Sequence, residues 1–386
     1  MPIHKMIGIF IFFYCQKLVR IIKGLDMLKI MGFPGEYIQG AHALRKIGDI
    51  AIRYQFKKIG IIYDQAIEGP ILSKATDSLN KANIDFISYK FPGECTYETI
   101  EHLSHTMEKH SIDSIIALGG GKAMDTTKGI SKKLNIPIII CPTVASSDAP
   151  TSRLIIVYDD YHKVQAVEKT KRNPDIVLVD LNTIVQAPAR FFAAGIGDAI
   201  SKMFEVNQCK NANGLNSFST PPLETALLLA NNTYSNLISW GKMAYEDVKQ
   251  HNITSSVEKV VESTVLLSGI GFESGGLSLA HALIRGLTAI PELATNLHGE
   301  LVAFGTVVQA VLENREHIFI NELISFLKSI DLPTAIAELG YHQEISDSML
   351  ETIIMHTLQN DYSKNFEPPL SKESLKQAII KTNHYR

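Results

Sequence analysis

Short apolar runs alternate with helical stretches in the first half of this 386-residue chain, and this alternation limits the folds open to it. The strand-like runs are residues 59–63, 85–91, 114–118 and 137–141. Stretches of helical composition lie between them, as at residues 99–110 and 125–134. Buried strands joined by helices predict a doubly wound parallel α/β sheet, with ligands beyond the carboxyl ends of its strands.

The pattern changes after Pro188, where long helical stretches replace the short apolar runs. We therefore predict an N-terminal α/β domain at residues 27–187 and an all-α C-terminal helical domain at residues 188–386. Residues 1–26 contain an apolar run at 7–15, which is about half the length that a membrane span needs. We interpret residues 1–26 as a dispensable N-terminal extension that precedes Met27; the alternative is a weak membrane-surface helix.

Composition narrows the class of protein. A net charge of -3 gives no electrostatic reason to expect binding to nucleic acid or to anionic membranes. The four cysteines are scattered without CxxC spacing, which argues against a disulfide framework and against a cysteine-based zinc site. These features predict a soluble cytoplasmic protein.

A glycine-rich turn, Gly119-Gly-Gly-Lys-Ala-Met-Asp125, follows the third strand-like run where a helix is expected to begin. Such a turn either binds phosphate through backbone N–H groups or serves only as a tight connection. Asp64 ends the first run, where an aspartate either accepts a ribose hydroxyl or caps a helix. Asp148 lies between Pro142 and Pro150 in a polar loop, either as a turn residue or as a catalytic carboxylate.

Three residues in the second half could form a metal site. His281 and His298 lie seventeen positions apart in small-residue, apolar surroundings, and Asp198 follows the small-residue run Ala193-Ala-Gly-Ile-Gly197. Two nitrogen ligands, one oxygen ligand and an open fourth position are typical of catalytic zinc. The alternative, histidines and an aspartate satisfied within the core, stays open on spacing alone.

Taken in order, these stretches resemble the glycerol dehydrogenase branch of the iron-containing (group III) alcohol dehydrogenase family. The resemblance runs from about Phe33 to Glu313. It also rests on Phe33-Pro…Tyr37-Ile-Gln-Gly40, Pro142-Thr143…Ser147-Asp148-Ala-Pro150, Gly271-Phe-Glu-Ser-Gly-Gly276, Ala280-His281-Ala and His298-Gly-Glu…Ala303-Phe-Gly305. It implies the dehydroquinate synthase-like architecture, a homo-oligomer (an octamer in the family), and reversible NAD-dependent oxidation of glycerol to dihydroxyacetone by zinc-assisted hydride transfer.

The resemblance also implies residue roles. The metal, one Zn²⁺ per subunit, would be held by Asp198, His281 and His298. The substrate polyol would contact Asp148 and His281, with Asp148 also catalytic. Asp64 would hold the ribose of NAD. The pyrophosphate would lie against Gly120, Gly121, Lys122, Ala123, Met124, Asp125, Thr143, Val144, Ala145 and Ser146. The nicotinamide end would contact Ser152, Leu154 and Tyr158.

The chain departs from the family pattern near the metal. Iron-using relatives carry a further histidine one helical turn after the aspartate, where this chain has Lys202, which favours zinc. Ile284 stands where relatives often have a second histidine, and Arg285 follows it, either to accommodate an anionic group or to pair with Glu292. Alternatives are therefore a same-fold metal-dependent dehydrogenase or reductase acting on another vicinal diol, hydroxyketone or hydroxy acid, and, more remotely, a dehydroquinate synthase-like lyase.

Overall fold

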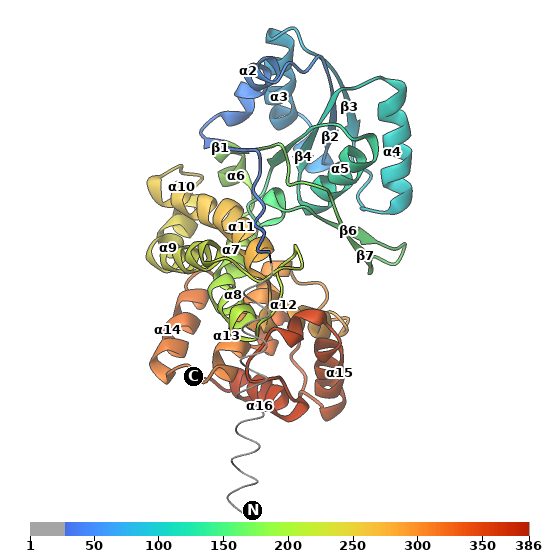
Figure 1. Ribbon diagram of the computed structural model, residues 1–386. Helices are drawn as coiled ribbons and strands as arrows, with labels where there is room; N and C mark the ends of the chain where they lie inside the picture. Colours follow the sequence, from blue (N-terminus) through green and yellow to red (C-terminus); the bar gives the residue numbers. More distant parts are fainter. Residues whose placement is uncertain (1–27, 386) are drawn as a thin grey trace, which may run out of the picture.

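The computed structural model describes residues 28–385, so the predicted extension at residues 1–26 lies outside the described residues. An α/β part and a helical part follow one another along the chain and lie at opposite ends of the molecule (Figure 1). The predicted fold class, a doubly wound parallel sheet followed by a helical half, is confirmed.

Six parallel strands form the main sheet in the spatial order β1-β8-β5-β4-β2-β3. Their bounds are β1 (Glu36–Gly40), β2 (Lys58–Tyr63), β3 (Asp85–Lys90), β4 (Ser114–Gly119), β5 (Ile138–Pro142) and β8 (Ile176–Asp180). The four strand-like runs between residues 59 and 141 correspond to β2, β3, β4 and β5. The sequence analysis missed β1, whose five residues are all only half-buried at the edge of the sheet.

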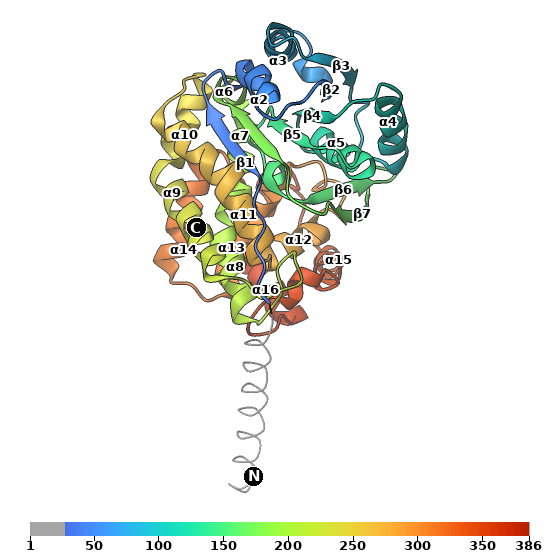
Figure 2. The ribbon, with the colours of Figure 1, turned by 45° about the horizontal axis from the view of Figure 1, so that its top comes forward.

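The central strands read as continuous apolar runs because both faces of the sheet are covered. In β4, Ile115 and Ala117 belong to one hydrophobic core, and Ile116 and Leu118 belong to another. Residues of α2 (Ile47–Arg53) and α3 (Pro70–Lys81) complete the smaller core. Residues of α4 (Tyr97–Lys109) and α5 (Gly121–Leu134) complete the larger one (Figure 2).

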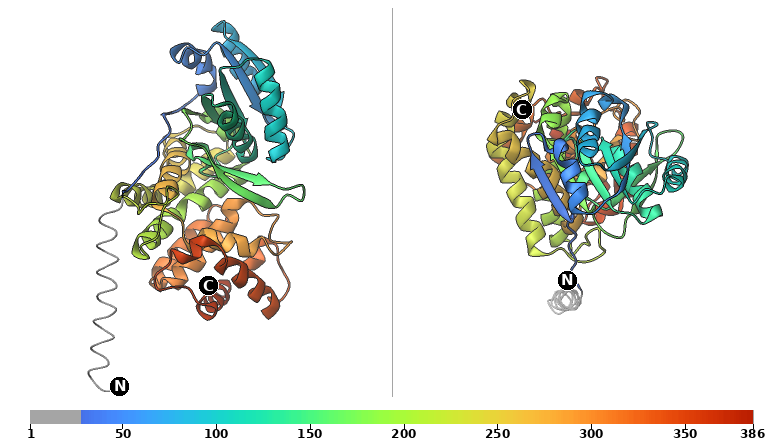
Figure 3. Two further views of the ribbon diagram at one scale, coloured as in Figure 1. Left: turned by 45° about the vertical axis from the view of Figure 1, so that its right-hand side comes forward. Right: turned by 90° about the horizontal axis from the view of Figure 1, so that it is seen from above.

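An antiparallel hairpin interrupts the α/β alternation between β5 and β8. Its strands are β6 (Leu154–Tyr158) and β7 (Val164–Lys169), and they project from the side of the molecule (Figure 3). The sequence of β6, Leu154-Ile-Ile-Val-Tyr158, is an apolar run that a polar turn follows, as a strand of a hairpin requires. Strand β7 has no such apolar run, because it is largely exposed and only Ala166 and Glu168 are partly buried.

From Leu181 to Asn383 the described chain contains helices and no strand. The helices are α6 (Leu181–Gln186), α7 (Ala189–Ile200), α8 (Lys202–Asn211), α9 (Glu224–Lys249), α10 (Ser255–Val261), α11 (Ser268–Gly275), α12 (Leu279–Leu287), α13 (His298–Leu312), α14 (His317–Lys328), α15 (Asp347–Leu358) and α16 (Lys372–Asn383). A π-helical turn, Glu262–Leu267, joins α10 to α11. Helix α13 is buried without a break from Gly299 to Val311, because its sequence is apolar on all sides.

The larger core runs through both halves, since it contains Val177 of the sheet together with Phe304 of α13. The predicted boundary at residues 187 and 188 falls between α6 and α7, and the division into two domains stays a prediction. Within residues 28–385, every helix falls short of the combined length and apolar character needed to cross a membrane.

Candidate metal and cofactor site

Asp198, His281 and His298 converge although they come from three different helices. One ligand atom from each lies within 4.8 Å of the other two. Asp198 Oδ1 is 3.3 Å from His281 Nε2 and 3.8 Å from His298 Nε2. Ligands about 2.1 Å from a tetrahedral zinc ion lie roughly 3.4 Å apart, so the three atoms have the spacing of a metal site.

Glycines let the helices that carry these ligands approach closely. A Cβ on Gly299 would overlap the carbonyl oxygen of Ala194, and a Cβ on Gly197 would overlap the carbonyl oxygen of Gly299. Helices α7 and α13 therefore cross at glycine, and this crossing brings Asp198 beside His298. The small-residue run before Asp198 and the His-Gly pair at 298–299 both reflect this crossing.

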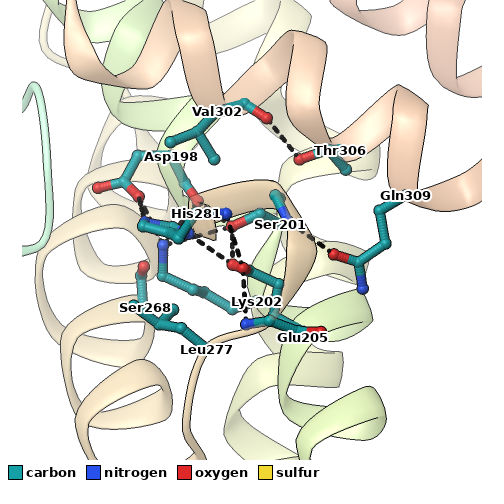
Figure 4. Close-up of polar contacts among 12 residues, drawn as sticks. Asp198, Ser201, Lys202, Glu205, Ser268, Leu277, His281, Val302, Thr306 and Gln309 are labelled. Atoms are coloured by element: carbon teal, nitrogen blue, oxygen red, sulfur yellow. Dashed lines mark hydrogen bonds and ion pairs between the residues drawn. The ribbon is translucent and has the colours of Figure 1, made fainter. Parts of the chain in front are cut away.

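Glu205 fixes the orientation of His281. Its Oε2 is 2.6 Å from His281 Nδ1, and its Oε1 accepts the backbone N–H groups of Ser278 and His281, both at 2.9 Å (Figure 4). Because Nδ1 is engaged by Glu205, Nε2 is left to face Asp198 and a metal. A carboxylate behind a ligand histidine is a common feature of metal sites, where it sets the tautomer and the ring orientation.

Lys202 brings a positive charge to the carboxylate of Asp198. Its Nζ donates to Asp198 Oδ1 at 2.5 Å and to the Asp198 carbonyl oxygen at 2.8 Å, and its side chain is fully buried. Lys202 Nζ also lies 3.2 Å from Asp148 Oδ2. The missing fourth iron ligand is therefore replaced by an ammonium group in direct contact with the predicted metal set.

Asp148 lies beside the metal set, as the sequence analysis expected. Its backbone N–H donates to Asp198 Oδ2 at 3.3 Å, and its own Oδ2 accepts the hydroxyl of Ser268 at 2.8 Å. Burial and the negative charge of Asp198 raise the pKa of Asp148, although Lys202 opposes this shift. A carboxylate with a raised pKa next to a metal site suits proton transfer.

The charges of the cluster separate the protonation states of the two histidines. Burial opposes protonation of His281, but the carboxylates of Glu205 and Asp198 outweigh it and raise the pKa of His281 to about 9. Desolvation in the crowded cleft and the positive charges of His281 and Lys202 lower the pKa of His298 to about 4, although its side chain is 49% exposed. The pKa of Asp198 is held well below its usual range: burial alone would raise it, but Lys202 and the histidines prevail.

The glycine turn lies at the carboxyl end of β4, where a phosphate could approach the N-terminus of α5. A Cβ on Gly121 would meet no atom within 4 Å, and one on Gly120 would only touch Val144 at 3.9 Å. Both glycines line a cleft of about 370 Å³ with Asp64 and Lys122. Asp64 also caps the short helix Gln65–Ile67 by accepting a hydrogen bond from the Ala66 N–H. The capping role is therefore observed, and the contact with a ribose hydroxyl stays a prediction.

The polar side chains of the turn have different surroundings. Lys122 Nζ lies 2.7 Å from Glu94 Oε2 and 4.7 Å from the centre of the Tyr158 ring, which places it between the cleft and β6. Asp125 is buried, and its two carboxylate oxygens are taken by Lys128 Nζ and by the backbone N–H of Ile156. The carboxylate of Asp125 therefore ties α5 to β6.

The other predicted cofactor contacts lie in the segment from the end of β5 to β6. Thr143 follows β5, and its N–H donates to the Gly119 carbonyl, so the two loops are joined. Ala145 is packed under α7, where a Cβ on Gly195 would overlap its carbonyl oxygen. Ser152 is buried with its hydroxyl on Ala149 O, and Leu154 begins β6. The roles toward NAD of all the predicted residues stay predictions, namely those of Asp64, Gly120, Gly121, Lys122, Ala123, Met124, Asp125, Thr143, Val144, Ala145, Ser146, Ser152, Leu154 and Tyr158.

Two residues that the sequence analysis passed over are central to this geometry. Glu205 lies seven positions after Asp198, which is two helical turns. Asp198 is in α7 and Glu205 in α8, but Ser201 between them keeps helical backbone angles, so both side chains face the same way. That spacing was a usable signal. Ser268 had none, because it reaches Asp148 only through the packing of α11, where Gly269 faces the Asp148 carbonyl. Nearby, Ile284 packs against the core and Arg285 is exposed.

Comparison with known proteins decides the family. The model of the iron-containing alcohol dehydrogenase family matches residues 34–181. A glycerol dehydrogenase of Thermotoga maritima is 35% identical over 92% of this chain and 96% of its own length. This chain belongs to the iron-containing alcohol dehydrogenase family. The crystal structure of glycerol dehydrogenase from Schizosaccharomyces pombe superposes with a TM-score of 0.88 at 32% identity, covering 93% of this chain and 91% of that one.

The same family contains relatives of this chain with other names. A glycolaldehyde reductase of Halobacterium salinarum is 34% identical over 81% of this chain and 86% of its own length. The resemblance drawn from the sequence motifs is thus confirmed at the level of the family and of its glycerol dehydrogenase members.

Proposed function

We propose that this chain is a glycerol dehydrogenase that oxidises glycerol to dihydroxyacetone with NAD, reversibly and with one zinc ion per subunit. The convergence of Asp198, His281 and His298 beside Asp148 carries the proposal. The similarity to named glycerol dehydrogenases supports the substrate. The glycine turn and Asp64, which line one cleft, support a dinucleotide without a 2′-phosphate.

Asp198, His281 and His298 would hold the metal. A divalent metal held there would supply Lewis-acid chemistry, which lowers the pKa of an alcohol hydroxyl. We assign zinc because the chain offers three protein ligands and has Lys202 where iron-using relatives have a fourth. Glu205 keeps His281 Nε2 directed at the site by occupying Nδ1.

The residues of the chain supply position and proton transfer. Asp148 would accept a hydrogen bond from a substrate hydroxyl, and its raised pKa supports a role in taking up a proton from that hydroxyl. Ser268 holds the Asp148 carboxylate by donating to Oδ2. NAD supplies the hydride acceptor, and the loops after β4 and β5 would position its nicotinamide against the substrate carbon.

The closest competing function is reduction of a small hydroxyaldehyde, which the similarity to the glycolaldehyde reductase favours. One assay separates the two. Purified protein is incubated with NAD and glycerol, with NADH and dihydroxyacetone, and with NADH and glycolaldehyde, each with added zinc or iron after metal depletion. The proposal predicts NADH accumulation with glycerol and the highest kcat/KM for the glycerol–dihydroxyacetone pair with zinc. A higher kcat/KM for glycolaldehyde would show that glycolaldehyde, and not glycerol, is the preferred substrate. The absence of net NADH formation or consumption would overturn the proposal that the chain is a dehydrogenase.

Assembly and compartment are proposed on the same resemblance. We infer a homo-oligomer, an octamer by family resemblance, in the cytoplasm. Sedimentation velocity of the purified full-length chain tests the assembly, because a monomer at micromolar concentration would contradict it.

A further inference from the structure

Lys202 is the buried group that the proposed reaction leaves without a task. Its Nζ contacts Asp198 Oδ1 and the Asp198 carbonyl, and it lies 3.4 Å from Ser201 Oγ and 3.2 Å from Asp148 Oδ2. An ammonium group has three N–H donors, and oxygen atoms of the protein surround this one. With its side chain fully buried, Lys202 has no donor left for a substrate or for NAD.

The ammonium group balances charge among buried carboxylates. Asp148, Asp198 and Glu205 are all buried around it, and a buried charge is costly unless it is paired. Among the described residues of this cluster, Lys202 is the only lysine or arginine. With both histidines neutral, as they are when they bind a metal, the three ionised carboxylates exceed the ammonium by two negative charges, which a divalent cation would neutralise. Lys202 thus holds the carboxylates together when that cation is absent.

The ammonium group and the metal would share one oxygen atom. Asp198 Oδ1 accepts from Lys202 Nζ at 2.5 Å, and the same atom lies 3.3 Å from His281 Nε2 across the metal set. A hydrogen bond to an ammonium group reduces the negative charge that this oxygen offers to a metal. The ammonium also repels a divalent cation a few ångströms away, in surroundings that screen the repulsion less than water does.

We propose that Lys202 is a tethered cation that keeps the metal site assembled without metal and weakens its affinity for divalent metal. This inference rests on the metal site of the proposed function. It makes Lys202 a positioning residue that acts through Asp198. An ordinary buried ion pair would stabilise the fold equally with and without metal, whereas a tethered cation affects the two forms in opposite directions.

The test replaces Lys202 by methionine, which keeps an unbranched side chain one heavy atom shorter and removes the charge. The matched control is Lys128→Met, because Lys128 is also buried and paired with an aspartate, Asp125. Its Nζ also donates to the carbonyl of Ala149, next to Asp148, but it makes no hydrogen bond to Asp198, His281 or His298. After chelator treatment of the full chain, the dissociation constants for Zn²⁺ and Co²⁺ are measured by competition with a chromophoric chelator. Unfolding temperatures are recorded with and without metal.

Lys202→Met is expected to bind both metals at least tenfold more tightly than the wild type. Its metal-free form should unfold at a lower temperature than the metal-free wild type, so that metal raises its unfolding temperature by more. Lys128→Met should lose stability equally with and without metal, and its dissociation constants should stay within twofold of the wild-type values.

Unchanged or weaker metal binding by Lys202→Met would overturn the inference. Lys202→Gln is made in parallel, and both variants are also expressed in zinc-supplemented medium. Folding only in the presence of metal supports the inference, because the cation then replaces the missing ammonium, whereas failure to fold even with metal overturns it. None of these readouts needs glycerol. If the wild type oxidises glycerol but the variants bind metal as the wild type does, this inference fails and the proposed function stands. If Lys202→Met binds metal more tightly but the wild type does not oxidise glycerol, the proposed function fails and this inference stands.

Discussion

The crossing of α7 and α13 at glycine gives the sharpest test of how this fold builds its site. We predict that Gly299→Ala separates His298 from Asp198. The added Cβ would overlap the carbonyl oxygen of Ala194 and lie 2.5 Å from its carbonyl carbon. Both atoms belong to the backbone of α7, so no side-chain rotation can relieve the contact.

The size of the effect follows from that distance. Carbon atoms in ordinary contact lie about 3.5–4.0 Å apart, so α7 and α13 would have to separate by at least roughly 1 Å. The carbonyl oxygen, which would lie closer still to the added Cβ, needs a larger movement. Overpacking of this kind costs about 1–3 kcal/mol, which leaves a typical domain folded. His298 precedes Gly299 directly and would move with it, whereas a metal site tolerates about 0.2 Å in its ligand distances. A 1 Å misplacement at a reacting centre costs about a hundredfold in rate.

The measurements are urea unfolding, the zinc dissociation constant and kcat/KM for glycerol. Gly299→Ala should stay folded, bind zinc at least tenfold more weakly and lose about a hundredfold in kcat/KM. Gly271→Ala in α11 is the control, because its Cβ would have only ordinary contacts at 3.8–3.9 Å. This substitution should raise the free energy of unfolding by about 0.5–1 kcal/mol. Zinc binding and activity within twofold of wild type in a folded Gly299→Ala protein would refute the reasoning.

Three further substitutions test single contacts. Glu205→Gln removes the charge behind His281 and should weaken zinc binding about 10- to 100-fold, measured by chelator competition. Asp148→Asn should lower kcat for glycerol about a hundredfold with zinc bound in full, measured by steady-state kinetics and metal analysis; undiminished kcat would exclude Asp148 from proton transfer. Asp64→Ser should raise the dissociation constant of NAD about tenfold and narrow the preference for NAD over NADP, measured by titration calorimetry.

Strand and helix periodicity was enough to predict the architecture, because the central strands are buried on both faces. β4 and β5 carry unbroken apolar residues, and such runs with helices between them leave few alternatives to a parallel sheet. The edge strand β1 was not predicted, because its half-buried position permits the mixed sequence Glu36-Tyr-Ile-Gln-Gly40. The exposed strand β7 escaped for the same reason.

The site divides in a similar way. Residue types and order pointed to Asp198, His281 and His298 as a set, and their spatial convergence depends on glycine contacts that no spacing rule contains. Lys202 was noticed only as a missing histidine, because its contact with Asp148 depends on how the loop after β5 packs on α7. Asp125 shows the converse. Its place in the glycine turn predicts a cofactor contact, which stays a prediction, whereas no pattern in the sequence indicated that Lys128 engages its buried carboxylate inside the protein.

The central claim is that a divalent metal held by Asp198, His281 and His298 enables this chain to oxidise glycerol with NAD. The most direct measurement is a zinc titration of metal-depleted protein, with NADH formation from glycerol followed at each step. The account predicts no turnover before zinc is added, a linear rise to one equivalent per chain, and no recovery in Asp198→Asn. Undiminished glycerol oxidation by protein verified as metal-free would contradict it.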